Sequence, residues 1–191
     1  YPSKPVRIVV PFTQGGGTDI VARLIAHKLQ ESWGQPVVIE ARTGGGGTIG
    51  AHIVAKATPD GYTLLGSSAA FAISAALNQN LPYDPVKDFA GVTRVGFGTA
   101  ALIVPPSLGV KTIPELIELA HAKPNQLIFS HAGIGTSTYM NGTRFQLAAG
   151  IKVKSVGFKG GADAGLEVVA GRVHYAIIGL TSTLSFIRDG R

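Results

Sequence analysis

Apolar residues along the chain are spaced alternately as in a strand and as in a helix. Short β-branched apolar runs predict buried parallel strands at PVRIVVPF (5–12), PVVIEAR (36–42) and YTLLGSS (62–68). The segments between these runs repeat their apolar positions every three or four residues, which predicts amphipathic helices. Because helices that cross between parallel strands imply a doubly wound sheet, this part of the chain predicts a βαβαβ unit.

The second half of the chain repeats the alternation after a polar, proline-bearing stretch. Residues 78–90 are typical of a surface loop, and the glycine-spaced residues 91–105 predict an extended crossover between two lobes. Thr112 and Glu115 form a capping-box pattern at the start of a helix expected over 113–122. Further strands are expected at 126–132, 153–158 and 172–179. The pattern therefore predicts two α/β halves of similar size.

The composition is that of a globular protein with a basic balance. Hydrophobic residues make up 45% of the 191 residues and charged residues 15%, and the net charge is +6. A basic balance favours acidic partners, but the lysines and arginines are scattered, so we expect no nucleic-acid partner. No apolar run is long enough to predict a transmembrane helix. The absence of cysteine excludes disulfides and thiolate metal sites.

Two glycine-rich loops each lie between an expected strand and an expected helix. The loop at 15–19 is a candidate anion cradle, in which Thr18 or Asp19 is expected to cap the helix and Asp19 to hold the loop. The loop at 45–50 matches G-x-G-x-x-G and suggests a dinucleotide site. However, it follows the second strand, and the acid expected about 20 positions later is replaced by Ser67-Ser68. A nucleotide- or NAD-dependent α/β enzyme is therefore the alternative hypothesis, and no cofactor is expected.

The sequence contains no recognisable catalytic or metal-ligating constellation. Its five histidines share no metal-ligand spacing, and there is no G-x-S-x-G motif. Ser130 and His131 are neighbours at a strand end, where adjacent side chains point to opposite faces, so they do not form a nucleophile and base. We expect a hydrogen bond to the backbone of a loop for Ser130. The sequence therefore predicts no catalytic residue, no metal and no enzyme activity.

Six motifs together resemble those of the Bug family, the TctC-like periplasmic solute receptors of tripartite tricarboxylate transporters. In order, they are YPSKPVRIVVPF, GGGTDIVARLIAHKL, WGQPVVIEARTGGGGTIGA, ATPDGYTLL, LPYDPVKDF and FKGGADAGLEVVAGRVHY. The resemblance implies a periplasmic-binding-protein fold of type II, a Venus flytrap with α/β lobes at 1–98 and 99–191. It also implies a periplasmic location after removal of a signal peptide, and delivery of a solute to the membrane subunits of the transporter.

The resemblance further implies that a small carboxylate is held between the lobes by backbone N–H groups and hydroxyls. Nearly every expected strand ends in Gly, Ser or Thr, and ligands of open α/β sheets bind beyond these ends. The ligand-binding residues predicted in the first lobe are Phe12, Thr13, Gln14, Gly15, Gly16, Gly47, Thr48, Ser67 and Ser68. Those predicted in the second lobe are Gly135, Thr136, Ser137, Gly160, Gly161, Ala162, Asp163, Thr181 and Ser182.

Two departures from the family pattern add expectations. Asp163 stands where the family commonly has proline, and its carboxylate favours a ligand with an amine or amide, so the partner is a small organic acid or an amino-acid-like molecule. Family members also continue beyond IRDGR, and that continuation completes the first lobe. We therefore expect an incomplete first lobe, whose open sheet edge and bare apolar face favour self-association.

Overall fold

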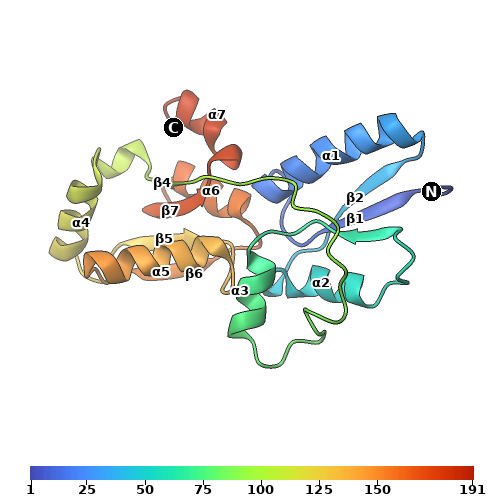
Figure 1. The fold of residues 1–191 in the computed structure, drawn as a ribbon. Coiled ribbons are helices and arrows are strands. Elements are labelled where there is room, and N and C mark those ends of the chain that lie inside the picture. The colour runs from blue at the N-terminus through green and yellow to red at the C-terminus, as the bar shows by residue number, and fades with distance from the viewer.

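The first lobe is built on a parallel three-stranded sheet (Figure 1). The computed structural model describes residues 1–191. The elements of the first lobe are β1 (Val6–Val10), α1 (Gly17–Trp33), β2 (Val37–Ala41), the 3-10 turn η1 (Gly45–Gly47), α2 (Thr48–Ala55), β3 (Thr63–Leu65) and α3 (Ala70–Leu77). The strand order is β2-β1-β3, and Ile8 of β1 pairs in register with Ile39 and Leu64. The βαβαβ prediction is confirmed, although β3 is shorter than expected.

The core of the first lobe explains why α1 crosses over this sheet. Val6, Ile8 and Val10 of β1 are buried against Ala22 and Ala26 of α1. Small alanines on the buried face of α1 let the helix lie close to the β-branched side chains of the strand, and this close packing excludes water from the core.

The start of α1 differs from the prediction. The N-cap of α1 is Gly16, so neither Thr18 nor Asp19 caps the helix. Asp19 lies in the first turn, where its Oδ2 accepts hydrogen bonds from the backbone N–H of Gly15 (3.0 Å) and from Nε of Arg23 (2.9 Å). Asp19 therefore holds the glycine loop, as expected, but from inside the helix.

The second lobe contains a mixed four-stranded sheet with the order β4-β7-β5-β6. Its elements are β4 (Ala100–Ile103), the 3-10 turn η2 (Pro106–Leu108), α4 (Ile113–Ala122), β5 (Ile128–His131), α5 (Ser137–Ala149), β6 (Lys154–Gly157), α6 (Gly161–Val169), β7 (Tyr175–Gly179), the 3-10 turn η3 (Leu180–Ser182) and α7 (Leu184–Arg188). β5 is parallel to β6 and β7, whereas β4 is antiparallel to β7. The three strands expected after residue 125 are therefore confirmed, and part of the expected crossover forms β4.

The core of the second lobe is centred on stacked aromatic rings. Phe129 and Tyr175 are fully buried, with ring centroids 5.2 Å apart. Thr112 caps α4 by accepting the N–H of Glu115 (3.4 Å), while the Glu115 carboxylate accepts the N–H of Lys111 (2.7 Å). The predicted cap is therefore confirmed, but its reciprocal bond reaches one residue further back than in a capping box.

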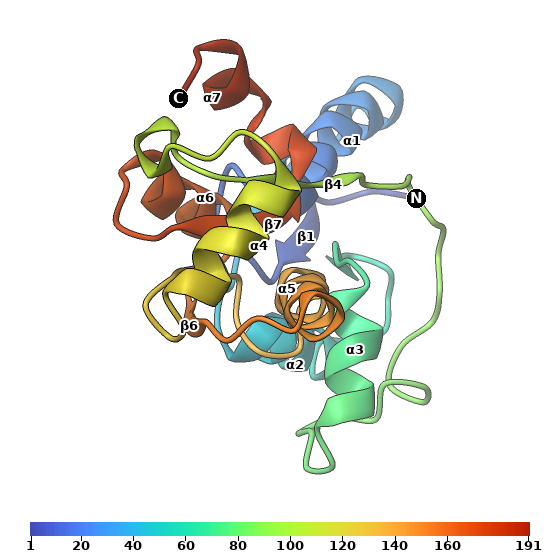
Figure 2. The ribbon, with the colours of Figure 1, turned by 90° about the vertical axis from the view of Figure 1, so that its left-hand side faces the viewer.

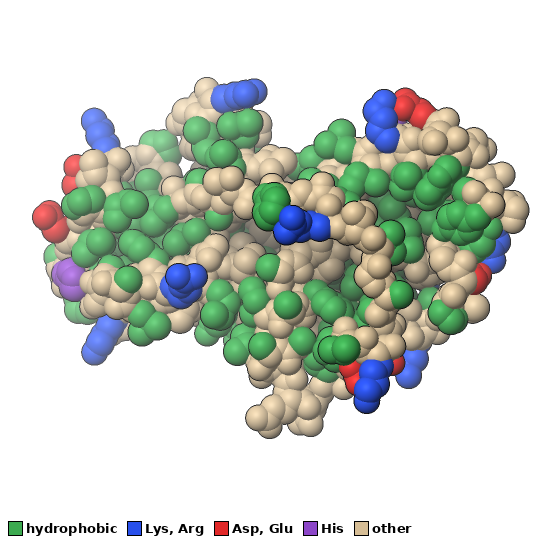
Figure 3. Space-filling model, viewed as in Figure 1, with side chains coloured by type: hydrophobic (Ala, Val, Ile, Leu, Met, Phe, Trp, Pro, Cys, Tyr) green, Lys and Arg blue, Asp and Glu red, His purple; other side chains and the backbone are tan.

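A single exposed segment, residues 91–99, leads from the first lobe to the second (Figures 1 and 2). Lys and Arg side chains are dispersed over the face seen in Figure 3 rather than gathered in one patch. No helix has the length and apolar character needed to cross a membrane. The lobe bounds of 1–98 and 99–191 remain a prediction.

Candidate functional site

The carboxyl ends of strands from the two lobes meet at the lobe boundary. The loop after β1 touches the loop after β6 so closely that a Cβ on Gly160 would collide with the Thr13 hydroxyl and lie 2.8 Å from its backbone nitrogen. Thr13 Oγ1 is buried there without a hydrogen-bond partner in the protein. Glycine at position 160 is therefore required by the close approach of the two loops.

A second contact joins the loop after β2 to the loop after β5. A Cβ on Gly46 of η1 would collide with the backbone carbonyl of Ile134. Ser74 of α3, which is 2% exposed, lies with its Oγ 3.3 Å from the carbonyl oxygen of Gly135 and 3.4 Å from that of Gly46. Ser74 thus links the two loops across the lobe boundary.

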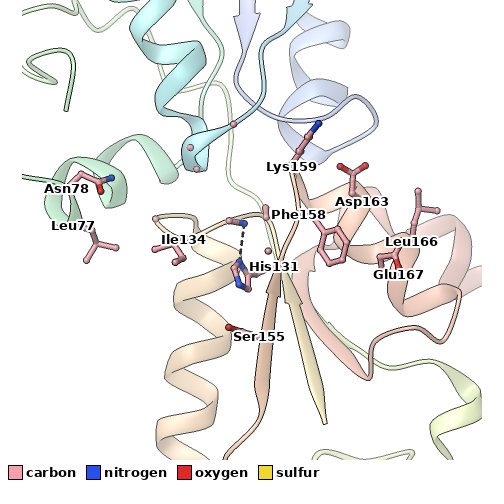
Figure 4. A pocket seen from close by; sticks show the side chains of 17 residues that line it. Leu77, Asn78, His131, Ile134, Ser155, Phe158, Lys159, Asp163, Leu166 and Glu167 are labelled. Carbon is pink, nitrogen blue, oxygen red and sulfur yellow. Dashed lines mark hydrogen bonds between the residues drawn. The ribbon is translucent and has the colours of Figure 1, made fainter. Parts of the chain in front are cut away.

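Beside this second contact lies an open cavity of about 1070 Å³ (Figure 4). The first lobe contributes the backbone of Gly44–Gly46 and the end of α3, with Leu77 and Asn78. The second lobe contributes the ends of β5 and β6, the loops that follow them and the first turns of α6. The cavity is therefore shared by both lobes at the ends of their strands.

His131, the last residue of β5, lines this cavity and is 3% exposed. Its Nδ1 accepts a hydrogen bond from the backbone N–H of Gly133 (3.1 Å), and its ring packs edge-on against Tyr139 of α5. Burial lowers the pKa of His131, which favours the neutral ring. Because Nδ1 accepts, the neutral ring carries its proton on Nε2. His131 therefore shapes the loop after β5.

Ser130 and His131 face different helices, as expected for neighbours on a strand. Ser130 Oγ donates to the backbone carbonyl of Ala164 in α6 (2.9 Å), whereas His131 packs against Tyr139 of α5. The prediction that they form no nucleophile and base is confirmed, but Ser130 bonds to a helix rather than to a loop. No three side chains of metal-ligating type converge anywhere in the chain.

The structure places the eighteen predicted ligand-binding residues in four settings. Gly135 and Asp163 line the cavity, while Thr13 and Gly160 form the other lobe contact. Four hydroxyls bond within their own loops: Thr48 to Gly45 (2.9 Å), Ser68 to Ala70 (3.3 Å), Thr136 to Gly133 (2.6 Å) and Ser182 to Gly179 (2.8 Å). The others lie outside the cavity, in loops after the strands, in η1 and η3, or in the first turns of α5 and α6: Phe12, Gln14, Gly15, Gly16, Gly47, Ser67, Ser137, Gly161, Ala162 and Thr181. Their role in binding remains a prediction.

Several cavity residues lay outside the predicted set. Leu77 was missed because no element is predicted over the residues of α3, and Asn78 because it begins the segment 78–90, which is predicted to be a surface loop. His131 and Lys159 also line the cavity but are not among the predicted ligand-binding residues. The strand-end rule that selected the other residues also selects His131, because it ends β5.

Two α/β lobes whose strand ends face each other over a shared cavity define the fold of a periplasmic solute-binding protein. The chain belongs to the tripartite tricarboxylate transporter receptor family, whose profile matches residues 21–191. Because the members of this family are receptors, the expectation that the chain is not an enzyme is confirmed. The alternative of a nucleotide-dependent enzyme is wrong.

Known relatives and solved structures cover the whole chain. Protein BugT of Bordetella pertussis is 36% identical over 192 residues, which span 100% of this chain and 59% of BugT. The structure of R. palustris Rpa4515 with adipate has a TM-score of 0.95 at 34% identity, covering 100% of this chain and 64% of that one. MatC from Rhodopseudomonas palustris with bound malate has a TM-score of 0.89 at 32% identity, covering 100% and 65%. The chain therefore spans less than two thirds of the length of these relatives.

Proposed function

We propose that the chain forms the binding lobes of an extracytoplasmic receptor that captures a small carboxylate and delivers it to the membrane subunits of a tripartite tricarboxylate-type transporter. The observation that carries this proposal is the meeting of two uncapped helix N-termini. The N-caps of α1 and α6, Gly16 and Gly160, make no side-chain capping bond, and both lie in the loops that meet at Thr13.

Uncapped helix N-termini favour an anion for two reasons. Their first N–H groups have no partner within the helix, and the helix dipole places partial positive charge there. Thr13 Oγ1, buried without a partner, adds a hydroxyl at the same place. A carboxylate needs several such donors and no formal positive charge when it is enclosed away from water.

The ligands of two similar structures support the same chemical class. Rpa4515 was solved with adipate and MatC with malate, and both ligands are dicarboxylates. The family and the periplasmic binding protein BugD, a further structural relative at 32% identity, support a periplasmic location.

The proposal is tested by thermal unfolding with mono-, di- and tricarboxylates, and with NAD and ATP as ligands of the alternative class. A ligand that binds only the folded protein raises its melting temperature, so at least one carboxylate should do so and the nucleotides should not. Gly160→Ala, which places a methyl group against Thr13, should reduce the carboxylate shift. Gly91→Ala, in the open connecting segment, is the matched control and should retain it. A shift with NAD alone contradicts the proposal.

A further inference from the structure

The hydroxyl of Ser74 lies between two backbone carbonyls that belong to different lobes. Its Oγ is 3.4 Å from the carbonyl oxygen of Gly46, in η1 of its own lobe, and 3.3 Å from that of Gly135, in the loop after β5 of the second lobe. A serine hydroxyl carries one proton, so it donates to one of these carbonyls at a time. Ser74 can therefore bond to either lobe without losing its partner in the other position.

The bond from Ser74 to Gly135 is the only one of its kind between the lobes. No other hydrogen bond and no ion pair joins residues 1–90 to residues 100–191, and no strand of one sheet pairs with a strand of the other. Ser74 is 2% exposed, and a Cβ on Gly135 would lie 2.7 Å from its Oγ, so the two loops enclose the hydroxyl where they touch. The directional polar contact between the lobes therefore depends on this one side chain.

The hydroxyl makes a difference to the closed arrangement that it does not make to an open one. When the lobes separate, water reaches the carbonyls of Gly46 and Gly135, so both keep a donor with or without Ser74. When the lobes meet as they do in this structure, the two carbonyls are brought together around one buried donor. Without that donor, two acceptors would be enclosed unsatisfied, which disfavours the closed arrangement.

We propose that Ser74 is a positioning residue that holds the lobes closed over the cavity. Gly46 and Gly135 line the cavity, but the side chain of Ser74 does not, so Ser74 acts through these two glycines rather than by touching a solute. Its effect on solute capture rests on the proposed receptor function. If only the closed form holds the solute well, the apparent affinity scales with the closed fraction that Ser74 sets.

The test measures lobe closure directly and without a solute. Because the chain has no cysteine, Lys56→Cys in the first lobe and Lys152→Cys in the second can be spin-labelled selectively. Both lysines are exposed and join no ion pair. Double electron–electron resonance then gives the distribution of distances between the labels. Ser74→Ala should lower the ratio of closed to open protein about threefold to tenfold, the scale of one hydrogen bond. A distribution unchanged from that of the wild type overturns the inference.

Ser130→Ala is the matched control for the loss of a buried hydroxyl. Ser130 is fully buried, and its Oγ donates to the carbonyl of Ala164 within the second lobe (2.9 Å). Ser130→Ala should therefore lower the melting temperature and leave the distance distribution unchanged. If Ser74→Ala also lowers only the melting temperature, Ser74 has a purely structural role and the inference is wrong.

A pair of glycine variants gives the direction of the change independently of Ser74. Gly46→Ala places a methyl group against the carbonyl of Ile134 in the second lobe, so it must separate the two loops. Gly34→Ala has the same φ of 65° and therefore the same backbone strain, but its Cβ meets no atom within 4 Å, and it should leave the distribution unchanged. Ser74→Ala should shift the distribution in the same direction as Gly46→Ala, and a shift in the opposite direction overturns the inference.

Isothermal titration calorimetry with adipate and malate connects closure to capture. Ser74→Ala should bind either probe about threefold to tenfold more weakly than the wild type, whereas Ser130→Ala should bind it equally well. Equal affinities of Ser74→Ala and the wild type overturn the role of Ser74 in capture. If no carboxylate binds the wild type, the proposed receptor function is contradicted, while the distance distributions still decide whether Ser74 holds the lobes closed.

Discussion

Gly142 of α5 lies against the ring of Phe129, which makes it a sensitive point of the second lobe. A Cβ at position 142 would overlap three ring atoms of Phe129, namely Cζ, Cε1 and Cε2. The ring is fully buried and stacks against Tyr175 at 5.2 Å, so it has little freedom to move away. Gly142→Ala must therefore displace α5 or force the ring from its preferred rotamer.

The size of the effect follows from two opposing contributions. Alanine is the better helix former and stabilises a helix interior by about 0.5–1 kcal/mol relative to glycine. Overpacking a rigid core costs about 1–3 kcal/mol, and the overlap with three ring atoms places this site toward the upper end. The net loss is about 1–2 kcal/mol, which lowers the melting temperature by roughly 2–8 °C in a chain of this size.

The assay is thermal unfolding followed by circular dichroism, with Gly17→Ala as the matched control. Gly17 is also helical, but a Cβ there meets no atom within 4 Å, so this variant should keep or raise the melting temperature. Replacing the Phe129 ring with the smaller leucine side chain should relieve the overlap. The double variant Gly142→Ala/Phe129→Leu should therefore lose less free energy of unfolding than the sum of the losses in the two single variants. A Gly142→Ala protein as stable as the wild type would refute the reasoning.

Three further predictions concern acid stability, capping and association. Burial lowers the pKa of His131, and burial together with Lys123 lowers that of His174; both Nδ1 atoms accept backbone N–H bonds. The unfolded chain therefore binds more protons than the folded chain. The melting temperature should stay constant at pH values above the ordinary histidine pKa of about 6.5 and should be lower at pH 5 than at pH 7. A higher melting temperature at pH 5 contradicts this prediction. Thr136→Ala removes the hydroxyl that accepts from Tyr139 and should cost about 0.5–2 kcal/mol in urea unfolding, with the exposed Thr181→Ala as a neutral control. Val38 on the edge strand β2 is 52% exposed, so we predict that light scattering will show concentration-dependent oligomers that Val38→Lys reduces; a monomer at all concentrations would contradict this.

The parts of the fold that could be predicted are those with a local signal. The strands around Ile8 and Phe129 stand out because their apolar runs are continuous, and Gly34 and Gly150 mark helix ends because both adopt the left-handed conformation. α3 lacked such a signal, since its N-cap is Ala69 and no side chain caps the helix. The antiparallel pairing of β4 depends on β7, more than seventy residues later, which no local pattern encodes.

The candidate site, too, could be predicted only where the signal is local. Glycines at strand ends could be predicted because close backbone approach requires them, and Gly160 and Gly46 both show it. The partners that they approach, Thr13 and Ile134, come from the opposite lobe, so sequence alone does not pair them. The set of side chains that line the cavity likewise depends on which elements the fold brings together.

The single connecting segment at 91–99 has a consequence for the energetics of ligand capture. One extended tether imposes few restraints on how the lobes rotate, so their relative orientation is set by the contacts that they make. Those contacts include the close approaches at Gly46 and Gly160, the Ser74 hydroxyl and the contact of α1 with η3. Since few groups hold one orientation, we expect a shallow equilibrium between open and closed forms. A solute then shifts the population by its differential affinity alone, so that even a weakly held solute can dominate the balance.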